Sequence, residues 1–181
     1  MMEGNLLLVL VALPFLAALV ASTISARTHN AAAWSSGLLL AAGLGILWVL
    51  RGPLQNGEVV RTTVRWVPSV GLDLSFRMDA FVWLFVTLVF AIAILVLVYA
   101  RYYLSKSDPV PRFHGFLMLF TGAMVGMLTS GNILMLVVFW ELTSLVSFLL
   151  IGYWHQGQAA RDGARMALVV TGIGGLCLLL A

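Results

Sequence analysis

The sequence Phe139-Trp140-Glu141-Leu142-Thr143 lies at the centre of an otherwise apolar run from Ile133 to Ile151. A helix of about this length crosses the hydrocarbon core of a bilayer, because each residue adds roughly 1.5 Å. An acidic side chain at mid-membrane costs roughly 2.5–3.5 kcal/mol on insertion scales, so stability alone would favour Leu or Ala. We therefore predict a functional role for Glu141 within the membrane. The alternative is a protonated glutamic acid that only hydrogen-bonds to a neighbouring helix.

The composition is that of an integral membrane protein. The 181 residues are 62% hydrophobic and only 9% charged, and the mean hydropathy is +1.05. A soluble domain has about 25% charged residues. The net charge of +3 is carried by short connecting segments, so it indicates membrane orientation and not nucleic-acid binding. The single cysteine, Cys177, excludes an internal disulfide, and no metal-ligand cluster or cofactor is expected.

Six apolar segments predict an all-α polytopic fold in a single membrane domain. We expect transmembrane helices at residues 6–25, 31–50, 80–100, 113–130, 133–152 and 164–181, the last of them incomplete. Residues 58–78 alternate apolar and polar side chains around a Pro/Ser turn, which predicts a β-hairpin on the membrane surface. Its apolar face suggests an external docking element, and a solvated cap that closes the loop is equally consistent. That face comprises Val60, Val64, Trp66, Leu72, Leu74 and Phe76.

Four further residues are candidates for the site. Thr143 and Ser144 are expected beside Glu141, because Ser144 follows it by about one helical turn. His114 and Asp79 are weaker candidates, since each stands at the mouth of a predicted span. A histidine at a helix end is more often an interfacial hydrogen-bonding group than a proton relay.

The basic residues predict an orientation. The connecting segments on one side hold six of them, Arg27, Arg101, Lys106, Arg112, Arg161 and Arg165, and the other side holds four, Arg51, Arg61, Arg65 and Arg77. Cytoplasmic loops carry the excess of Lys and Arg. The sequence therefore predicts that the N-terminus and the hairpin lie outside.

Several motifs resemble one known family. Residues 139–145 (FWELTSL) and 149–154 (LLIGYW) are similar to the large A subunit of Mrp-type cation/proton antiporters. That subunit is similar in turn to the antiporter-like, proton-pumping subunits of respiratory complex I. The residues 78–81 (MDAF), 102–106 (YYLSK) and 112–113 (RF) also fit. The sequence TGIGG at 171–175 favours the antiporter branch, because the complex I proteins are expected to carry an arginine and an acidic residue there.

The resemblance implies one subunit of a secondary transporter, not an enzyme. It would be part of a multisubunit monovalent cation/proton antiporter in the cell (inner) membrane that exchanges protons for Na⁺, with other membrane subunits as partners. Glu141 would relay protons opposite a lysine on a later, broken helix. The chain's one lysine, Lys106, lies in a loop, so that partner is expected beyond Ala181 and the chain is expected to be a fragment. Two alternatives remain, a proton-pumping subunit of a complex I-like NADH–quinone oxidoreductase and a structural membrane subunit.

Overall fold

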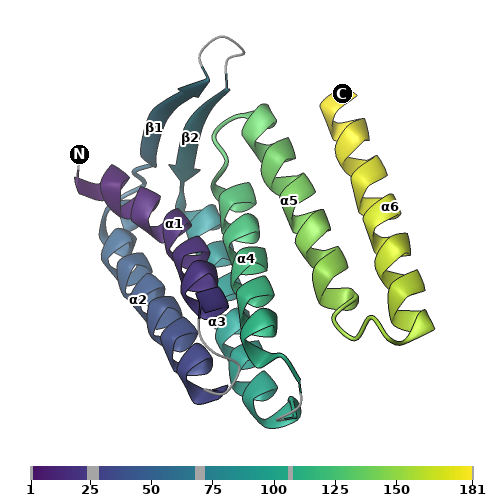
Figure 1. Cartoon of the computed structure of the whole chain (residues 1–181). Helices are drawn as coiled ribbons and strands as arrows, with labels where there is room; N and C mark the ends of the chain where they lie inside the picture. Colours follow the sequence, from purple (N-terminus) through teal and green to yellow (C-terminus); the bar gives the residue numbers. More distant parts are fainter. Residues whose placement is uncertain (1, 24–28, 68–71, 106–107, 181) are drawn as a thin grey trace.

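The computed structural model describes residues 2–23, 29–67, 72–105 and 108–180. Within these residues, the chain forms α1 (Met2–Thr23), α2 (His29–Gln55), β1 (Val60–Val67), β2 (Leu72–Met78), α3 (Ala80–Tyr103), α4 (Val110–Thr129), α5 (Ile133–Ile151) and α6 (Gln158–Leu180). Figure 1 shows the helices running up and down side by side, with the hairpin at the end where α1 begins and α6 finishes. The predicted helical membrane fold with a hairpin between the second and third helices is confirmed.

Five of the described helices, α1, α2, α3, α5 and α6, are long and apolar enough to cross a membrane. Helix α4 falls outside this group, and Arg112 and His114 near its start lower its hydropathy. Most of its residues are nevertheless buried, because it packs against α1, α3 and α5. The predicted span at 113–130 therefore corresponds to an interior helix that is shielded by its neighbours.

Large apolar side chains from four helices fill the core, and those with no exposed surface include Leu7, Leu10, Leu40, Leu47, Phe90 and Met118. Gly43 of α2 makes room for the Phe90 ring of α3, because a methyl group there would overlap the ring. The Trp83 indole N–H donates to the Leu47 carbonyl at 2.7 Å, which joins the same two helices. Close packing and hydrogen bonds of this kind hold helices together in lipid, where no hydrophobic force selects one helix partner over another.

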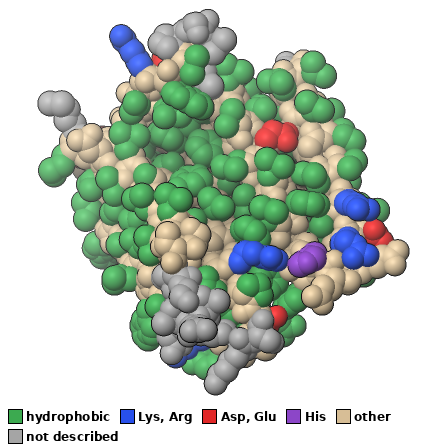
Figure 2. Space-filling model, in the orientation of Figure 1, with side chains coloured by type: hydrophobic (Ala, Val, Ile, Leu, Met, Phe, Trp, Pro, Cys, Tyr) green, Lys and Arg blue, Asp and Glu red, His purple; other side chains and the backbone are tan. Residues whose placement is uncertain are grey.

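The outer faces of the bundle are apolar. Exposed side chains include Trp48 of α2, Leu95 of α3 and Val169 of α6. Figure 2 shows hydrophobic side chains covering most of one face, with basic and histidine side chains gathered towards its lower right. A surface of this kind suits lipid and not water.

The hairpin pairs β1 with β2 in antiparallel register from Val60–Met78 to Val64–Leu74, and the register then shifts before Val67. Its apolar face, expected to be free for docking, is in part covered by the chain itself. Val60, Phe76 and Met78 are buried against the helices, whereas Val64 and Trp66 remain 41% and 55% exposed. The turn predicted at Pro68–Ser69 lies outside the described residues.

A pair of hydrogen bonds, here called the hairpin joint, connects β2 to the start of α5. The Gly131 N–H donates to the Ser75 carbonyl at 2.7 Å, and the Asn132 side-chain amide donates to the Asp73 carbonyl at 3.0 Å. Asn132 also caps α5, because its side-chain oxygen accepts the Met135 N–H at 2.8 Å. Glycine is required at 131, since a Cβ there would lie 2.9 Å from the Ser75 carbonyl oxygen.

Most of the helices are longer than the apolar segments that predicted them. Helix α6 begins at Gln158, although the span was expected to start at 164, and α2 continues to Gln55. Charged residues such as Arg161 and Asp162 are compatible with helix outside the hydrocarbon core. The apolar run from 164 thus lies inside a longer helix.

Candidate functional site

Glu141 lies near the middle of the 19-residue α5, among apolar side chains. Asn132 fixes where this helix starts, so the position of Glu141 along the helix is defined by a local cap. The carboxyl oxygen Oε1 of Glu141 is buried and has no hydrogen-bond partner among the described residues. An unpartnered buried acceptor costs free energy, so Glu141 is less favourable at this position than an apolar residue would be.

Two glycines of α6 accommodate the Glu141 carboxyl. A Cβ at Gly172 would lie 3.9 Å from Oε2, which is ordinary contact, whereas a Cβ at Gly175 would overlap Oε1. The same Cβ at position 175 would lie 2.9 Å from Trp140 Cδ1. We call the surface formed by Gly172 and Gly175 the glycine notch. Any larger residue at 175 would move the carboxyl or separate the helices.

Trp140 fixes α5 against α6 beside the glycine notch. Its indole N–H donates to the backbone carbonyl of Thr171 at 3.1 Å. The Thr171 hydroxyl in turn donates to the Ala167 carbonyl one turn earlier at 2.7 Å. Trp140 thus joins the two helices by a hydrogen bond, and the adjacent Glu141 places its carboxyl between them.

The predicted hydroxyl neighbours of Glu141 make different contacts. Thr143 Oγ1 donates to the Trp140 carbonyl at 2.7 Å, and Ser144 Oγ donates to the same carbonyl at 3.1 Å. Both residues line a cavity of about 270 Å³ between α4, α5 and α6, together with Phe120, Met124, Met127, Trp140, Ser147 and Thr171. The hydroxyls therefore stand close to the acid along the chain, but the carboxyl itself points to the glycine notch.

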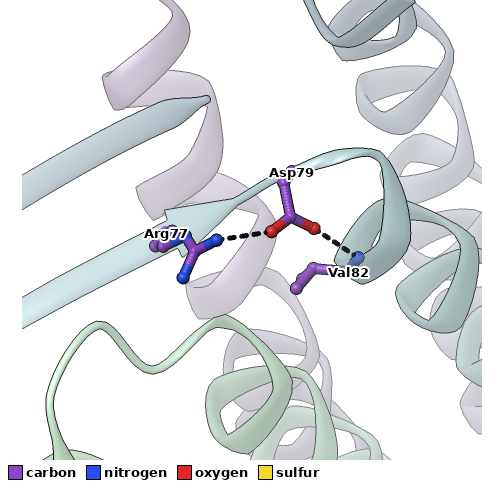
Figure 3. Close-up of polar contacts among 3 residues, drawn as sticks. All are labelled: Arg77, Asp79 and Val82. Atoms are coloured by element: carbon purple, nitrogen blue, oxygen red, sulfur yellow. Dashed lines mark hydrogen bonds and ion pairs between the residues drawn. The ribbon is translucent and has the colours of Figure 1, made fainter. Parts of the chain in front are cut away.

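The weaker candidates lie at opposite ends of the bundle and are not brought to Glu141. Asp79 is the N-cap of α3, where it accepts the Val82 N–H at 2.9 Å and pairs with Arg77 at 2.7 Å (Figure 3). These contacts give Asp79 a structural task at the exit of the hairpin. His114 lies in the second turn of α4 and has no exposed surface. Its burial follows from the packing of α4, which begins at Val110 and contacts α1, α3 and α5.

Sequence reasoning missed the glycine notch, although a signal was present. Gly172 and Gly175 are three residues apart, which places them on one face of a helix. Their spacing allows a close approach of another helix. What the spacing could not indicate is which helix approaches and that a carboxyl fills the gap.

Two family models match the chain. The model described as NADH:quinone oxidoreductase/Mrp antiporter, TM, matches residues 130–181, which contain Glu141 and the glycine notch. The model described as NADH-Ubiquinone oxidoreductase (complex I), chain 5 N-terminus, matches residues 66–114. The probable K(+)/H(+) antiporter A/B subunit of Rhizobium meliloti (strain 1021) is 46% identical over 174 residues, or 96% of this chain. The chain belongs to the family of Mrp-type antiporter subunits.

Other relatives agree with this Mrp-type assignment. The Na(+)/H(+) antiporter A1 subunit of Staphylococcus haemolyticus (strain JCSC1435) is 42% identical over 125 residues, or 69% of this chain. The chain spans 17% of the Rhizobium protein and 16% of the Staphylococcus protein. In the structure of the Mrp complex from Dietzia sp. DQ12-45-1b, one chain superposes with a TM-score of 0.85 at 28% identity, over 96% of this Mrp-type chain and 18% of that one. The archaeal membrane-bound sulfane sulfur reductase shares the fold alone, with a TM-score of 0.76 at 16% identity over 95% of this chain and 26% of that one.

Proposed function

We propose that this chain is part of the large subunit of a multisubunit monovalent-cation/proton antiporter and that Glu141 carries the proton. The observation that supports the relay most directly is the buried, unpartnered Oε1 of Glu141 in the glycine notch. A proton cannot cross hydrocarbon without a titratable carrier, and an intramembrane carboxyl is such a carrier. Glu141 is well placed for this role because it lies near the middle of α5 and its carboxyl faces α6, and both helices are candidate spans.

The transfer itself requires only a change of protonation at Glu141. The carboxylate accepts a proton from water or from a protonated basic group on one side, and the carboxylic acid then releases that proton to water on the other side. Within the described residues, Thr143, Ser144, Ser147 and Thr171 line a cavity nearby, and their hydroxyl groups can order water between Glu141 and the cavity. The opposing basic group is proposed to be a lysine on a later helix of the full-length protein.

A structural role for Glu141 fits the geometry less well. A glutamic acid that only joined helices would donate or accept a hydrogen bond across the interface, but in the described structure Trp140 makes the α5–α6 bond instead. A complex I-like pumping subunit is the second candidate, supported by the descriptions of the two matching family models. Against it, the tight fit at Gly175 leaves no room for the arginine or acidic side chain that the complex I proteins are expected to carry in this part of α6.

We propose Na⁺ as the exchanged cation. The name of the Staphylococcus relative gives Na⁺, and that of the Rhizobium relative gives K⁺. The decisive experiment uses the complete complex in inverted membrane vesicles, with a pH-sensitive dye and added NaCl or KCl. Glu141→Gln should assemble normally and lose exchange, while Glu141→Asp should keep part of it. Wild-type exchange with Gln at 141 would remove the relay role. A response to KCl alone would reassign the ion and leave the relay intact.

The orientation is also a proposal. The N-terminus and the hairpin are placed outside the cell membrane because the opposite side carries more basic residues. In a Cys177→Ser background, Asn56→Cys should react with a membrane-impermeant thiol reagent in intact cells, whereas Gln156→Cys should react only after the membrane is opened. The reverse pattern would invert the topology.

A further inference from the structure

A basic pocket lies where α4 and α6 begin and α5 ends. It has a volume of about 350 Å³ and is lined by Arg112, Arg161, Arg165 and His155. Its other wall includes Phe116, Phe148 and Leu149. Figure 2 shows basic and histidine side chains gathered at this end of the face that α4, α5 and α6 form. The pocket is therefore cationic on one side and apolar on the other.

Two of the three guanidinium groups are held in place by the protein. Arg112 donates to the Tyr153 carbonyl at 3.0 Å, and its guanidinium carbon lies 5.3 Å from the Tyr153 ring and 5.8 Å from the Phe116 ring. Arg161 donates to the His155 carbonyl at 3.0 Å. These contacts leave other N–H groups of each fork available, and a preformed fork matches the oxygens of a phosphate.

The three arginines of the pocket have no ion-pair partner among the described residues. The described lining of the pocket contains no acidic side chain. Arg161 and Arg165 are four residues apart on α6, a spacing at which like charges repel. Burial and the nearby Asp108 carboxylate raise the pKa of the Tyr153 phenol, against a smaller lowering by Arg112, so this phenol stays neutral and does not offset the charge.

The pocket also lies at headgroup depth. Tyr153 and Trp154 follow the end of α5, and their rings are 5.3 Å apart. The Tyr103 ring at the end of α3 lies 6.1 Å from that of Trp154. Tyrosine and tryptophan gather at the membrane–water interface, with the hydrocarbon beginning a short distance further in. Phe116 and Phe148 extend from the pocket in that direction along α4 and α5.

We propose that this basic pocket binds the headgroup phosphate of an anionic phospholipid, with one acyl chain against Phe116 and Phe148. Arg112 and Arg161 provide positioned donors, and Arg165, which makes no hydrogen bond or ion pair in the described structure, completes the charge. The apolar wall distinguishes a lipid from a free anion, because inorganic phosphate gains nothing from it. In the orientation proposed above, the lipid belongs to the cytoplasmic leaflet, which is the anionic one.

The test uses the purified complete complex, stripped of lipid and titrated with phosphatidylglycerol, with bound lipid counted by native mass spectrometry. Arg165→Gln should weaken binding about fivefold and Arg161→Gln/Arg165→Gln about thirtyfold, while Arg165→Lys stays nearer to wild type. Arg101→Gln is the matched control, since it removes an exposed arginine from the end of α3 over the Trp34 ring. Its affinity should equal that of wild type, and all variants should elute and melt as the wild-type complex does.

Three results would overturn the proposal. Equal weakening by Arg101→Gln and Arg165→Gln would mean that only overall surface charge attracts the lipid. Displacement of phosphatidylglycerol by millimolar inorganic phosphate would make the pocket a free-phosphate site. Absence of tightly bound phosphatidylglycerol in the wild-type complex would mean that another protein segment fills the pocket.

Discussion

Gly175→Ala tests whether the glycine notch sets the position of the proton-carrying acid. The added methyl carbon would overlap Glu141 Oε1 and lie 3.0 Å from Glu141 Cδ and 2.9 Å from Trp140 Cδ1. Overpacking of this kind costs about 1–3 kcal/mol. If the strain is relieved by rotating the carboxyl away, its wild-type position becomes about 5- to 150-fold less populated. We therefore expect cation-driven proton exchange to fall at least about fivefold.

The chain supplies matched controls for this change. A Cβ at Gly172 would lie 3.9 Å from the nearest carboxyl oxygen, and one at Gly174 would lie 3.7 Å from Trp140. Gly172→Ala and Gly174→Ala gain the same helix propensity as Gly175→Ala, so the three variants differ mainly in overlap. Exchange should be measured in inverted vesicles and normalised to assembled complex.

A second change can relieve the overlap. Glu141→Asp shortens the side chain by one methylene, so adding it to Gly175→Ala should restore part of the lost exchange, although Glu141→Asp alone lowers it. Equal activity of the three alanine variants would refute the idea that the notch positions the acid. Additive losses in the double variant would refute the steric explanation.

Three further changes address the surrounding structure. Asp79→Ala should lower the melting temperature of the complex, because about 1 kcal/mol of helix-capping energy is lost. Asp79→Asn should retain most of that capping energy. Lost exchange with unchanged stability would instead place Asp79 on the ion path. Trp140→Phe removes the donor to the Thr171 carbonyl and should destabilise by about 0.5–1.5 kcal/mol, seen as earlier melting; unchanged melting would show that the bond is dispensable. Trp66→Ala should reduce recovery of assembled complex after detergent extraction while exchange per complex is kept, and impaired exchange with full assembly would reverse that assignment.

The order of helices and the hairpin followed from hydropathy because lipid imposes a length and an apolar composition on each span. The same rule does not report where a helix begins outside its apolar run, and α6 starts at Gln158, because Arg161 and Asp162 are compatible with helix. It also could not indicate that His114 is buried, because α4 is enclosed by other helices. Hydropathy reports suitability for the membrane interior and does not report which neighbours surround a helix.

The position of Glu141 was predicted, but its surroundings were not. Helical periodicity placed Ser144 near the acid, yet a serine in a helix can bond the carbonyl four residues earlier, and Ser144 does so at Trp140. The facing residue, Gly175, belongs to another helix, and apolar sequences do not indicate which faces of two helices meet. The hairpin shows the same limit, because alternation identified its apolar face but not that Phe76 and Val60 pack on the chain's own helices.

The hairpin joint couples the hairpin mechanically to the helix that carries Glu141. Gly131 and Asn132 connect β2 to the first turn of α5, and Glu141 follows Asn132 by nine residues, or about 14 Å of helix. A partner that tilts or presses the hairpin would therefore displace α5 along its own axis, since a helix is stiff in that direction. The Glu141 carboxyl would then move relative to α6 by the same amount. A partner subunit bound to the exposed part of the hairpin would therefore change the alignment of this carboxyl without contacting it.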